Sequence, residues 1–386
     1  MQLIEFGAIM HLIKGKKPKN QSSECKNGFM PYVDIEAFET GKIENYTDGE
    51  KCLSCSDGDI LIVCDGSRSG LVGKALNGYV GSTLAKISAK GLISNYLYYF
   101  LQGKYTLLNT KKKGTGTPHL NPELLKKQEI YVPSLEEQQQ IVARIEELFS
   151  ELDKGVETLQ TIKQQLAVYR QAVLKEAFEG NFKRCTLKEI STAISGYAFK
   201  SKKYTTSGNY IVVKIGNVKQ WNFDFSRDLT KTNEADDTIL TKYLMKQGDC
   251  LITLTGSRGK RDYGFVAMIE DEDNFLLNQR VAALRFNTEV ALPKFYMYYL
   301  TSFDYRNQFF SYETGNVGQG NVGIKALSEP IVVCPPLKTQ YKIVEEIESR
   351  LSVCDSIEQT VDTALAQAES MRQSILKKAF EGGFSE

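Results

Sequence analysis

The chain has 386 residues and a mass of 43.4 kDa, which is long enough for two to four domains. Hydrophobic residues make up 42% of it, which excludes wholesale disorder, and 30 glycines against 9 prolines exclude a collagen-like architecture. The net charge is only +1, and no apolar run is long enough for a membrane span or a secretory signal, so we expect a soluble, cytoplasmic protein.

The first segment, residues 1–132, is predicted to form a mixed α/β body. The apolar run at 59–64 lies between Gly, Asn and Asp turns, which is typical of a short buried strand. The clearest amphipathic helix in this body is at 94–102. Its tyrosines, Tyr96, Tyr98 and Tyr99, recur at helical spacing and are interpreted as core residues rather than as residues that stack on bases.

The eight cysteines are scattered along the chain rather than clustered as in a small disulfide-rich domain. Cys52 and Cys55 form one CxxC pair, and Cys25 and Cys64 could complete a set of four zinc ligands. Because the chain contains no second close pair, reduced thiols are the preferred interpretation.

The second segment, 133–182, carries apolar residues at steps of three and four, which predicts one long helix with a heptad seam. Ser134 is a suitable first residue and Gly180 a suitable stop. At 1.5 Å per residue the helix would be roughly 60 Å long. The predicted seam consists of Gln138, Ile141, Ile145, Leu148, Leu152, Val156, Leu159, Ile162, Leu166, Tyr169 and Val173.

The third segment, 183–334, repeats the first body loosely. Gly58-Asp59 and Gly248-Asp249 each precede an apolar strand run, and 92–102 resembles 292–302 in its tyrosine pattern. Strands are expected at 210–215 and 250–254. The tyrosines of the second helix pattern, Tyr296, Tyr298 and Tyr299, are again interpreted as core.

The fourth segment, 335–386, repeats the long helix closely. With a shift of 202 positions, residues 133–182 lie over 335–384 without a gap, and 21 of 50 positions are identical, which indicates a duplication. Pro336 and Gly382 stand where a helix would begin and end. The second seam consists of Ile343, Ile347, Leu351, Cys354, Ile357, Val361, Ala364, Ala368, Met371 and Ile375.

The predicted fold class is therefore α+β, with two α/β bodies separated by two long helices in a pseudo-twofold repeat. A long helix with one apolar stripe cannot bury that stripe alone. Since the first helix leads from one body to the other, the second must run back, which predicts an antiparallel intramolecular coiled coil. The alternative is that each helix pairs with a second chain in a dimer. The expected domain boundaries are 1–132, 133–182, 183–334 and 335–386.

The charge is unevenly distributed between the helices and the bodies. The helix repeats at 135–180 and 337–382 hold 11 basic and 17 acidic residues, whereas the rest of the chain holds 37 basic and 30 acidic residues. A basic excess on the bodies is compatible with contacts to nucleic-acid phosphates, although solvated surface lysines would give the same count.

Glycine-rich polar loops recur at matched places in both bodies. Small and amide side chains suit close approach to base edges and phosphates, and Arg or Lys could read guanine or hold a phosphate. The candidate DNA-binding residues of the first body are Gly66, Ser67, Arg68, Lys111, Lys112, Lys113, Thr115, Thr117 and His119. Those of the second body are Lys214, Asn217, Ser257, Arg258, Lys260, Arg261, Asn316, Gln319 and Asn321.

Catalytic signatures are absent from the sequence. It contains no GxxxxGK[ST] phosphate loop, no GxSxG elbow, no HExxH and no amino-methyltransferase motif. Only two histidines, His11 and His119, are present as bases for a nucleophile. We therefore expect a protein without catalytic residues or a metal site of its own.

The ends of the two helix repeats carry shared phrases. Pro-x-Leu-x-x-Gln occurs at 133–138 and 335–340, and Leu-Lys-x-Ala-Phe-Glu-Gly occurs at 174–180 and 376–382. Together with a Gly-Asp strand and a tyrosine-rich helix in each body, this pattern resembles the specificity (S) subunit of Type I restriction–modification systems. The resemblance covers essentially the whole chain.

The resemblance implies that each body is a target recognition domain that reads one half of a bipartite, asymmetric DNA target. The helices would set the spacing between the half-sites and dock two methyltransferase (M) subunits, with restriction (R) subunits joining for cleavage. S-adenosylmethionine would be bound by M and not by this chain. The chain would be a non-catalytic subunit of the complex.

Two other classes of protein remain open from the residues alone. One is a standalone, non-catalytic DNA-binding regulator, and the other is a coiled-coil scaffold whose bodies bind proteins. A scaffold would show no salt-dependent DNA binding, whereas a DNA-binding protein loses affinity steeply as the salt concentration rises.

Overall fold

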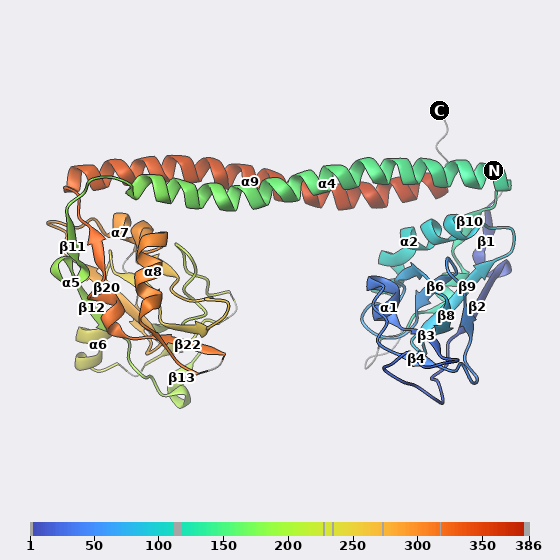
Figure 1. Cartoon of the computed structure of the whole chain (residues 1–386), viewed down its shortest axis with the longest axis horizontal. Coiled ribbons are helices and arrows are strands. Elements are labelled where there is room, and N and C mark those ends of the chain that lie inside the picture. The colour runs from blue at the N-terminus through green and yellow to red at the C-terminus, as the bar shows by residue number, and fades with distance from the viewer. Residues whose placement is uncertain are drawn as a thin grey trace. The chain divides into compact units, whose positions relative to one another are not determined.

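The structure is a computed structural model that describes residues 3–111, 118–226, 228–233, 235–271, 274–316 and 318–381. The chain divides into two compact units, Met1–Thr161 with Val361–Glu386, and Ile162–Thr360. Each unit contains one α/β body and a half of each of two long helices, α4 (Leu135–Phe178) and α9 (Leu337–Glu381). Figure 1 shows the elements of both units.

The first body contains two four-stranded sheets and one two-stranded pair. The first sheet has the order β2 (Met10–Lys14), β9 (Leu84–Ala89), β6 (Ile60–Val63), β7 (Val72–Lys74), with antiparallel neighbours throughout. The second has the order β4 (Tyr46–Thr47), β3 (Met30–Val33), β8 (Gly78–Val80), β5 (Ser54–Cys55), and only β3 and β8 are parallel. β1 (Leu3–Glu5) pairs with β10 (Glu129–Tyr131). The helices are η1 (Phe6–Ala8), α1 (Ile35–Thr40), α2 (Ser94–Thr110) and α3 (Pro122–Lys126).

The second body repeats the first sheet of this plan and three strands of the second sheet. Its first sheet has the order β12 (Ser191–Ser195), β20 (Val281–Phe286), β16 (Cys250–Thr253), β18 (Val266–Met268), again antiparallel throughout. Its second has the order β13 (Tyr204–Thr205), β15 (Lys231–Thr232), β14 (Tyr210–Val213), β19 (Phe275–Leu277), and only β14 and β19 are parallel. β11 (Arg184–Thr186) pairs with β23 (Ile331–Val333). The helices are α5 (Leu187–Ile190), η2 (Ser201–Lys203), α6 (Asp237–Tyr243), α7 (Pro293–Tyr299), α8 (Phe303–Ser311) and η3 (Ile324–Leu327).

The first sheets of the two bodies match in strand order and direction, and β15, β14 and β19 correspond to β4, β3 and β8, which confirms the duplication of the bodies. Among the described strands, β5 and β13 have no equivalent in the other body's second sheet. The strands predicted at 59–64, 210–215 and 250–254 are β6, β14 and β16, each one or two residues shorter than expected. The second body also has a three-stranded sheet with the order β17 (Thr255–Ser257), β22 (Gln319–Val322), β21 (Glu313–Thr314). It has no counterpart among the described strands of the first body.

The central strand β6 is buried on both faces, as its unbroken apolar run requires. Ile60 and Ile62 pack in the core beneath α2, whereas Leu61 and Val63 point to the opposite face and pack against the second sheet. This alternation is the two-residue period of a strand. α2 lies between the first sheet and α4, and its tyrosines join that packing (Figure 1).

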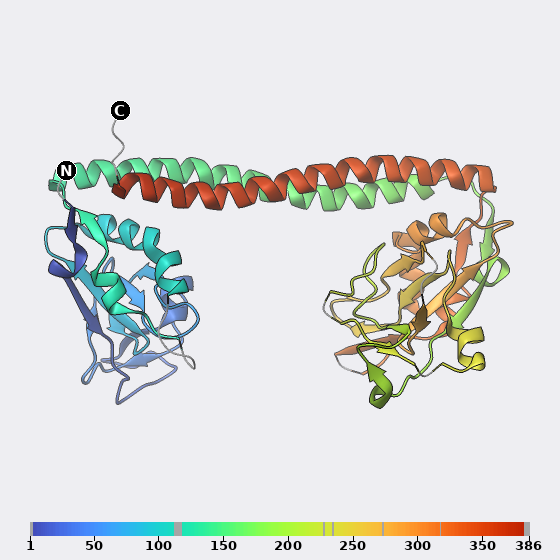
Figure 2. The ribbon, with the colours of Figure 1, turned by 180° about the vertical axis from the view of Figure 1, so that it is seen from behind.

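In each unit, α4 and α9 run antiparallel and lie side by side (Figures 1 and 2). In the second unit Arg170 binds Asp355 and Glu358, and Arg350 binds Glu176, so residue numbers fall on α9 as they rise on α4. In the first unit Arg372 is ion-paired with Asp153 in the same sense. The predicted antiparallel coiled coil is thus confirmed.

The predicted seam is largely correct but has exceptions. Ile145, Val173 and Leu351 are buried, whereas Tyr169 and Met371 are exposed to 47% and 54%. The prediction was wrong at these two positions and at Ile357, which is 40% exposed. Next to the bodies the helices must also bury a second stripe, and this stripe consists of Val142, Phe149, Leu174, Phe178, Leu376, Ala379 and Phe380.

A glutamine fastens the start of each long helix to its body. The Gln138 side chain accepts a hydrogen bond from the Ile93 backbone N–H at 2.9 Å and donates to the carbonyl oxygens of Gly91 and Pro133. Gln340 makes the equivalent three bonds, with Leu292 N–H, Val290 O and Pro335 O. Both glutamines are fully buried. The glutamine of the Pro-x-Leu-x-x-Gln phrase therefore forms the joint between each long helix and its body.

Candidate nucleic-acid interface

In the first body, the structure brings together three of the segments that carry candidate residues. The loop after β6 contacts Pro118 and His119. The Gly66 N–H donates a hydrogen bond to Pro118 O at 2.8 Å, and Asp65 forms an isolated β-bridge with His119. The Asn109 amide, near the end of α2, donates to the carbonyl oxygens of Ser67 and Ser69. The α2 terminus at Lys111 is thereby held near this loop.

Asp65 lies at the centre of a small charge cluster beneath the loop. Its two carboxylate oxygens contact Lys14 Nζ at 2.8 Å and His119 Nδ1 at 2.7 Å. Burial alone would raise the pKa of Asp65, but the hydrogen bonds and positive charges of Lys14 and His119 outweigh it, so its pKa lies below the ordinary value. His119 is thus partly engaged in shaping the loop.

The other candidate residues of the first body differ in how far they are open to an external ligand. Arg68 is half exposed and ion-paired with Glu39. Gly66 has a φ of +104°, a left-handed conformation that favours glycine. Lys111 is exposed. The remaining four candidates lie outside the described residues: Lys112, Lys113, Thr115 and Thr117.

In the second body, the two loops singled out from the sequence meet in one sheet. β17 pairs with β22, so that Ser257 lies opposite Gln319 and Thr255 lies opposite Asn321. The Thr255 hydroxyl donates to Asn321 Oδ1 at 2.8 Å. The side chains of Gln319 and Asn316 are exposed beside it. Residues as far as 66 positions apart in the sequence thereby form one polar surface.

The basic residues of the loop after β17 differ in how far they are bound by other parts of the chain. Arg258 donates to Glu313 and to the Gly315 carbonyl, each at 3.3 Å. The guanidinium of Arg261 lies over the Phe310 ring at 4.8 Å. Lys260 is exposed at the tip. Arg258 therefore supports the loop, and Lys260 remains available to a phosphate.

Two candidates on the turn after β14 have structural roles. Asn217 is 1% exposed, and its amide donates to the carbonyl oxygens of Asp224 and Asp228. Its amide is committed to the backbone and does not face solvent. Lys214 is ion-paired with Asp228 at 2.6 Å and lies over the Tyr204 ring. These contacts close the turn.

A groove of about 460 Å³ beside β17 contains cations that the sequence analysis missed. It is lined by Lys219 and Arg280 together with hydroxyl, amide and glycine residues of β16, β17 and the segment before β22. In the sequence, Arg280 follows Asn278-Gln279 between two apolar runs, a polar turn signal that resembles the chosen loops. The first body has Thr83 at the matching place, just before β9, so no basic residue recurs at this position in both bodies.

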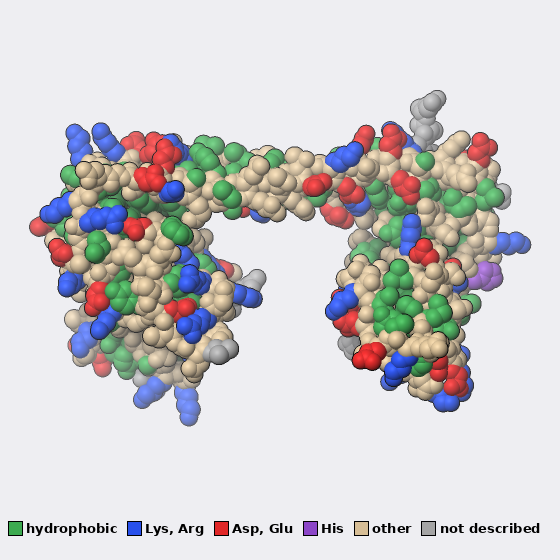
Figure 3. Space-filling view, in the orientation of Figure 1, with side chains coloured by type: hydrophobic (Ala, Val, Ile, Leu, Met, Phe, Trp, Pro, Cys, Tyr) green, Lys and Arg blue, Asp and Glu red, His purple; other side chains and the backbone are tan. Residues whose placement is uncertain are grey.

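Lysine and arginine side chains stand on the surface of the second body at the end remote from α4 and α9 (Figure 3). A body with such a surface can attract polyanions.

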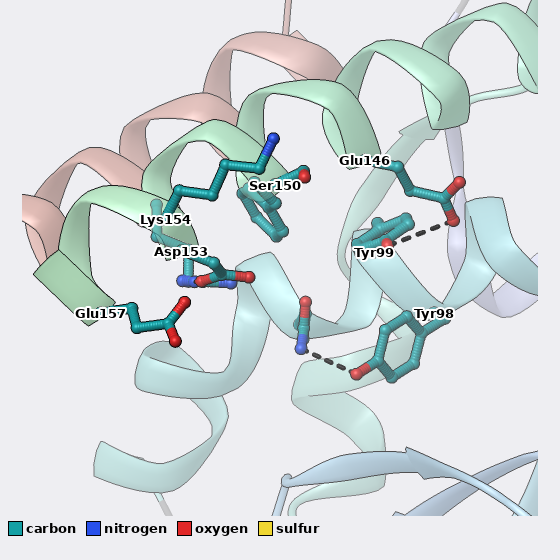
Figure 4. A pocket seen from close by; sticks show the side chains of 10 residues that line it. Tyr98, Tyr99, Glu146, Ser150, Asp153, Lys154 and Glu157 are labelled. Carbon is teal, nitrogen blue, oxygen red and sulfur yellow. Dashed lines mark hydrogen bonds and ion pairs between the residues drawn. The ribbon is translucent and has the colours of Figure 1, made fainter.

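Four of the tyrosines predicted as core residues, Tyr96, Tyr296, Tyr298 and Tyr299, are buried, whereas Tyr98 and Tyr99 are only partly buried. Tyr96, Tyr296 and Tyr299 are fully buried, and burial raises the pKa of Tyr298 to about 12. In the first unit, Tyr99 of α2 is directed toward Glu146 of α4, with its hydroxyl 3.3 Å from Oε1 (Figure 4). A cavity of about 510 Å³ surrounds this contact between α2 and α4, and Arg372 and Asp153 form an ion pair in its wall.

The cysteines considered as zinc ligands do not form a site. Burial raises the pKa of the Cys55 and Cys64 thiols to about 11. Across the described ranges, no three His, Cys, Asp or Glu side chains are grouped to hold a metal ion. Within the same ranges, no helix is both long and apolar enough to cross a membrane.

Comparison with known sequences gives a consistent result. The family described as "Type I restriction modification DNA specificity domain" matches residues 1–166 and 179–367. The Type I restriction enzyme MjaVIII specificity subunit of Methanocaldococcus jannaschii is 27% identical over 90% of this chain and 85% of its own length. The Type I restriction enzyme EcoKI specificity subunit of Escherichia coli K12 is 24% identical over 97% of this chain and 87% of its own.

Solved structures share the fold. A chain from a structure titled as the basis of complex assembly and conformational transition of the type I R-M system superimposes with a TM-score of 0.77, at 19% identity over 99% of this chain and 98% of that one. The HsdS subunit of Thermoanaerobacter tengcongensis gives a TM-score of 0.57, at 19% identity over 99% and 97%. The repeated bodies, the paired helices and the family match over most of the sequence lead to one conclusion: the chain belongs to the family of Type I restriction–modification DNA specificity subunits.

Proposed function

We propose that each body of this specificity subunit reads one half of a bipartite DNA target. The observation that carries the proposal is that the two bodies share their first sheet and three strands of the second but differ in their surface loops. Asp65, His119 and Arg68 occupy the loop of the first body, whereas β17 and β22 with Arg258 and Gln319 occupy that of the second. Different side chains read different bases, so the two half-sites should differ and the target should be asymmetric.

We further propose that the helices set the number of base pairs between the half-sites and dock methyltransferase subunits, two per specificity subunit. Several apolar side chains on and beside the helices are open, as expected of a protein-binding surface. Val168 and Phe303 are 71% and 77% exposed, and both line a largely apolar hollow of about 800 Å³ in the second unit. Restriction subunits would join the complex for cleavage.

Methyl transfer would then take place on the partner. S-adenosylmethionine is expected on the methyltransferase subunit, and the role of this chain would be to bind and position the DNA. The first-body residues that fit this role are Gly66, Ser67, Arg68, Lys111 and His119, and the second-body residues are Ser257, Lys260, Arg261, Asn316, Gln319 and Asn321.

A base-resolved methylation map tests the proposal. DNA would be sequenced from cells that express this chain with its methyltransferase partner and from cells that lack this gene. We expect a split, asymmetric methylated adenine motif that disappears with the gene. If both proteins are expressed and no motif depends on this chain, the proposal is wrong, and a regulator or a scaffold becomes the better explanation.

A further inference from the structure

The groove beside β17 brings together two cations that have no intramolecular partner among the described residues, whereas several other basic side chains of the second body are paired. Arg285 is bound by the buried Asp249, Arg258 by Glu313, and Lys214 by Asp228. By contrast, Arg280 and Lys219 are exposed and take part in no ion pair or side-chain hydrogen bond within the described residues. Their charges are free to meet an external ligand.

Arg280 is held on a rigid support. It directly precedes β20, and its carbonyl oxygen accepts a hydrogen bond from the Leu254 N–H at 3.0 Å. The turn before it is closed by the Val281 N–H bonding to Asn278 O at 2.9 Å and by the Gln279 N–H bonding to Tyr197 O. Gly196 packs so closely on this turn that an added Cβ would lie 1.9 Å from Asn278 O. These contacts fix the backbone from which the Arg280 side chain extends.

The groove also contains an acceptor, which distinguishes its ligand from a simple phosphate. Asp262 lines it, and its Oδ1 accepts a hydrogen bond from the Ser257 N–H at 2.6 Å. That backbone hydrogen bond holds the pKa of Asp262 below its ordinary value, so the carboxylate is charged at neutral pH. A carboxylate repels a phosphate but accepts a hydrogen bond from the exocyclic amine of cytosine. Gln319 also lines the groove and adds an exposed amide.

We infer that this groove is the base-reading site of the second body, and that Arg280 reads a guanine in its half-site. The planar guanidinium matches the O6 and N7 acceptors of guanine, and the nearby carboxylate suits the paired cytosine. Lys219, at the rim, holds a backbone phosphate. The inference rests on the proposed function and adds the residues and the base that carry its sequence specificity.

The test uses the complex of the full chain with its methyltransferase. A duplex carrying the motif found in the wild-type methylation map is the probe, and a duplex of unrelated sequence is the reference. For Arg280→Ala we expect about 10- to 100-fold weaker binding to the motif duplex with little change for the unrelated duplex. In the methylation map, one G·C position of one half-site should become variable while the other half-site is unchanged.

Two further variants separate base reading from phosphate contact. Arg280→Lys keeps the positive charge but loses the planar guanidinium that can donate two hydrogen bonds to one base. It should therefore reduce sequence specificity at the same position of the motif. Lys219→Ala should weaken binding to both duplexes equally and lower the slope of log affinity against log salt by about one. Lys242→Ala, which removes an exposed cation on α6, is the matched control and should leave the motif intact.

The outcomes are distinguishable. If the wild-type chain directs a motif but Arg280→Ala leaves both motif and affinity unchanged, this inference fails and the proposed function stands. Equal loss on both duplexes would make Arg280 a phosphate contact and also overturn the inference. If the wild-type chain directs no motif, the proposed function itself fails.

Discussion

At the scale of single residues, the strongest constraints are buried polar side chains whose partners are all backbone groups. Gln138 and Gln340 each satisfy one N–H and two carbonyl groups at the joint between helix and body. A leucine of similar volume would leave these groups buried without partners, and each would cost about 1–3 kcal/mol. The glutamine of the entry phrase is therefore explained by the joint.

Gln340→Leu should lower the free energy of unfolding by about 2–4 kcal/mol. Chemical denaturation of the purified chain would measure it. Gln164→Leu, at an exposed position of α4, is the matched control and should change stability by less than about 0.5 kcal/mol. Equal effects of the two substitutions would contradict the role of the joint.

A second residue-scale prediction concerns pH. The pKa of Asp65 is lower in the folded protein than its ordinary value because Lys14 and His119 bind the carboxylate. A depressed folded-state pKa stabilises the fold above the unfolded-state value of about 3.9, and this stabilisation is lost as the pH falls through the lower folded-state value. The difference in unfolding free energy between the wild type and Asp65→Asn should thus shrink as the pH falls from about 5 to 2. Denaturation curves of both proteins, measured across that pH range, test this prediction. A difference in unfolding free energy that stays constant with pH would show that the contact does not stabilise the fold.

At the scale of elements, the helix pair is fastened by equivalent ion pairs in its two units. Arg170 binds Asp355 and Glu358 at 2.7 and 2.8 Å, and Arg372, its equivalent after 202 positions, binds Asp153. Arg372 also lies over the Phe149 ring at 4.5 Å. These contacts specify the antiparallel register, while the apolar stripes supply most of the burial.

A double-mutant cycle with Arg170→Ala and Asp355→Ala should give a coupling free energy of about 0.5–1 kcal/mol. The value is small because the Asp355 side chain is 69% exposed, and it should decrease further at 1 M salt. The pair Arg144 and Glu147, which lies within α4, serves as the comparison because it does not join the two helices. Coupling that is indifferent to salt would exclude an ionic origin.

Helix length is an element-level difference between the bodies. The helix predicted at 94–102 continues as α2 to Thr110, whereas the matching segment of the second body is divided into α7 and α8. The division falls at Ser302, whose hydroxyl accepts a hydrogen bond from the Tyr305 N–H and begins α8. A serine that caps a new helix competes with continuation of the old one.

At the scale of the whole molecule, each compact unit takes one half of its helix pair from each of the two repeats. Because 21 of 50 positions are identical between the helices, a copy of the first repeat can offer the surfaces that the second repeat offers. A fragment of residues 1–182 has an uncovered helix stripe and should dimerise through it. Sedimentation equilibrium should give twice the fragment mass, whereas a stable monomer would show that the two helices are not interchangeable.

The sequence by itself determined the repeat, the two long helices and their direction. These follow from periodicity and connectivity, because an apolar stripe needs a partner and the duplicated helix supplies it. It also predicted the loops around Gly66, Ser257 and Gln319 as candidate DNA contacts, since glycine and amide residues recur at matched places. The prediction of the helix seams was less accurate where burial against a body competes with burial against the other helix, as at Tyr169 and Met371.

Only the tertiary structure decided which polar side chains are available. Asn217 and Arg258 look like exposed recognition residues in the sequence, but backbone carbonyls and Glu313 engage them. Arg280 follows a short polar turn that the sequence alone does not mark as a binding site. It becomes a candidate because residues of β17, β22 and the turn after β14 line one groove together with it. The physical reason is that a polar side chain's role depends on its partners, and those partners come from residues distant in sequence.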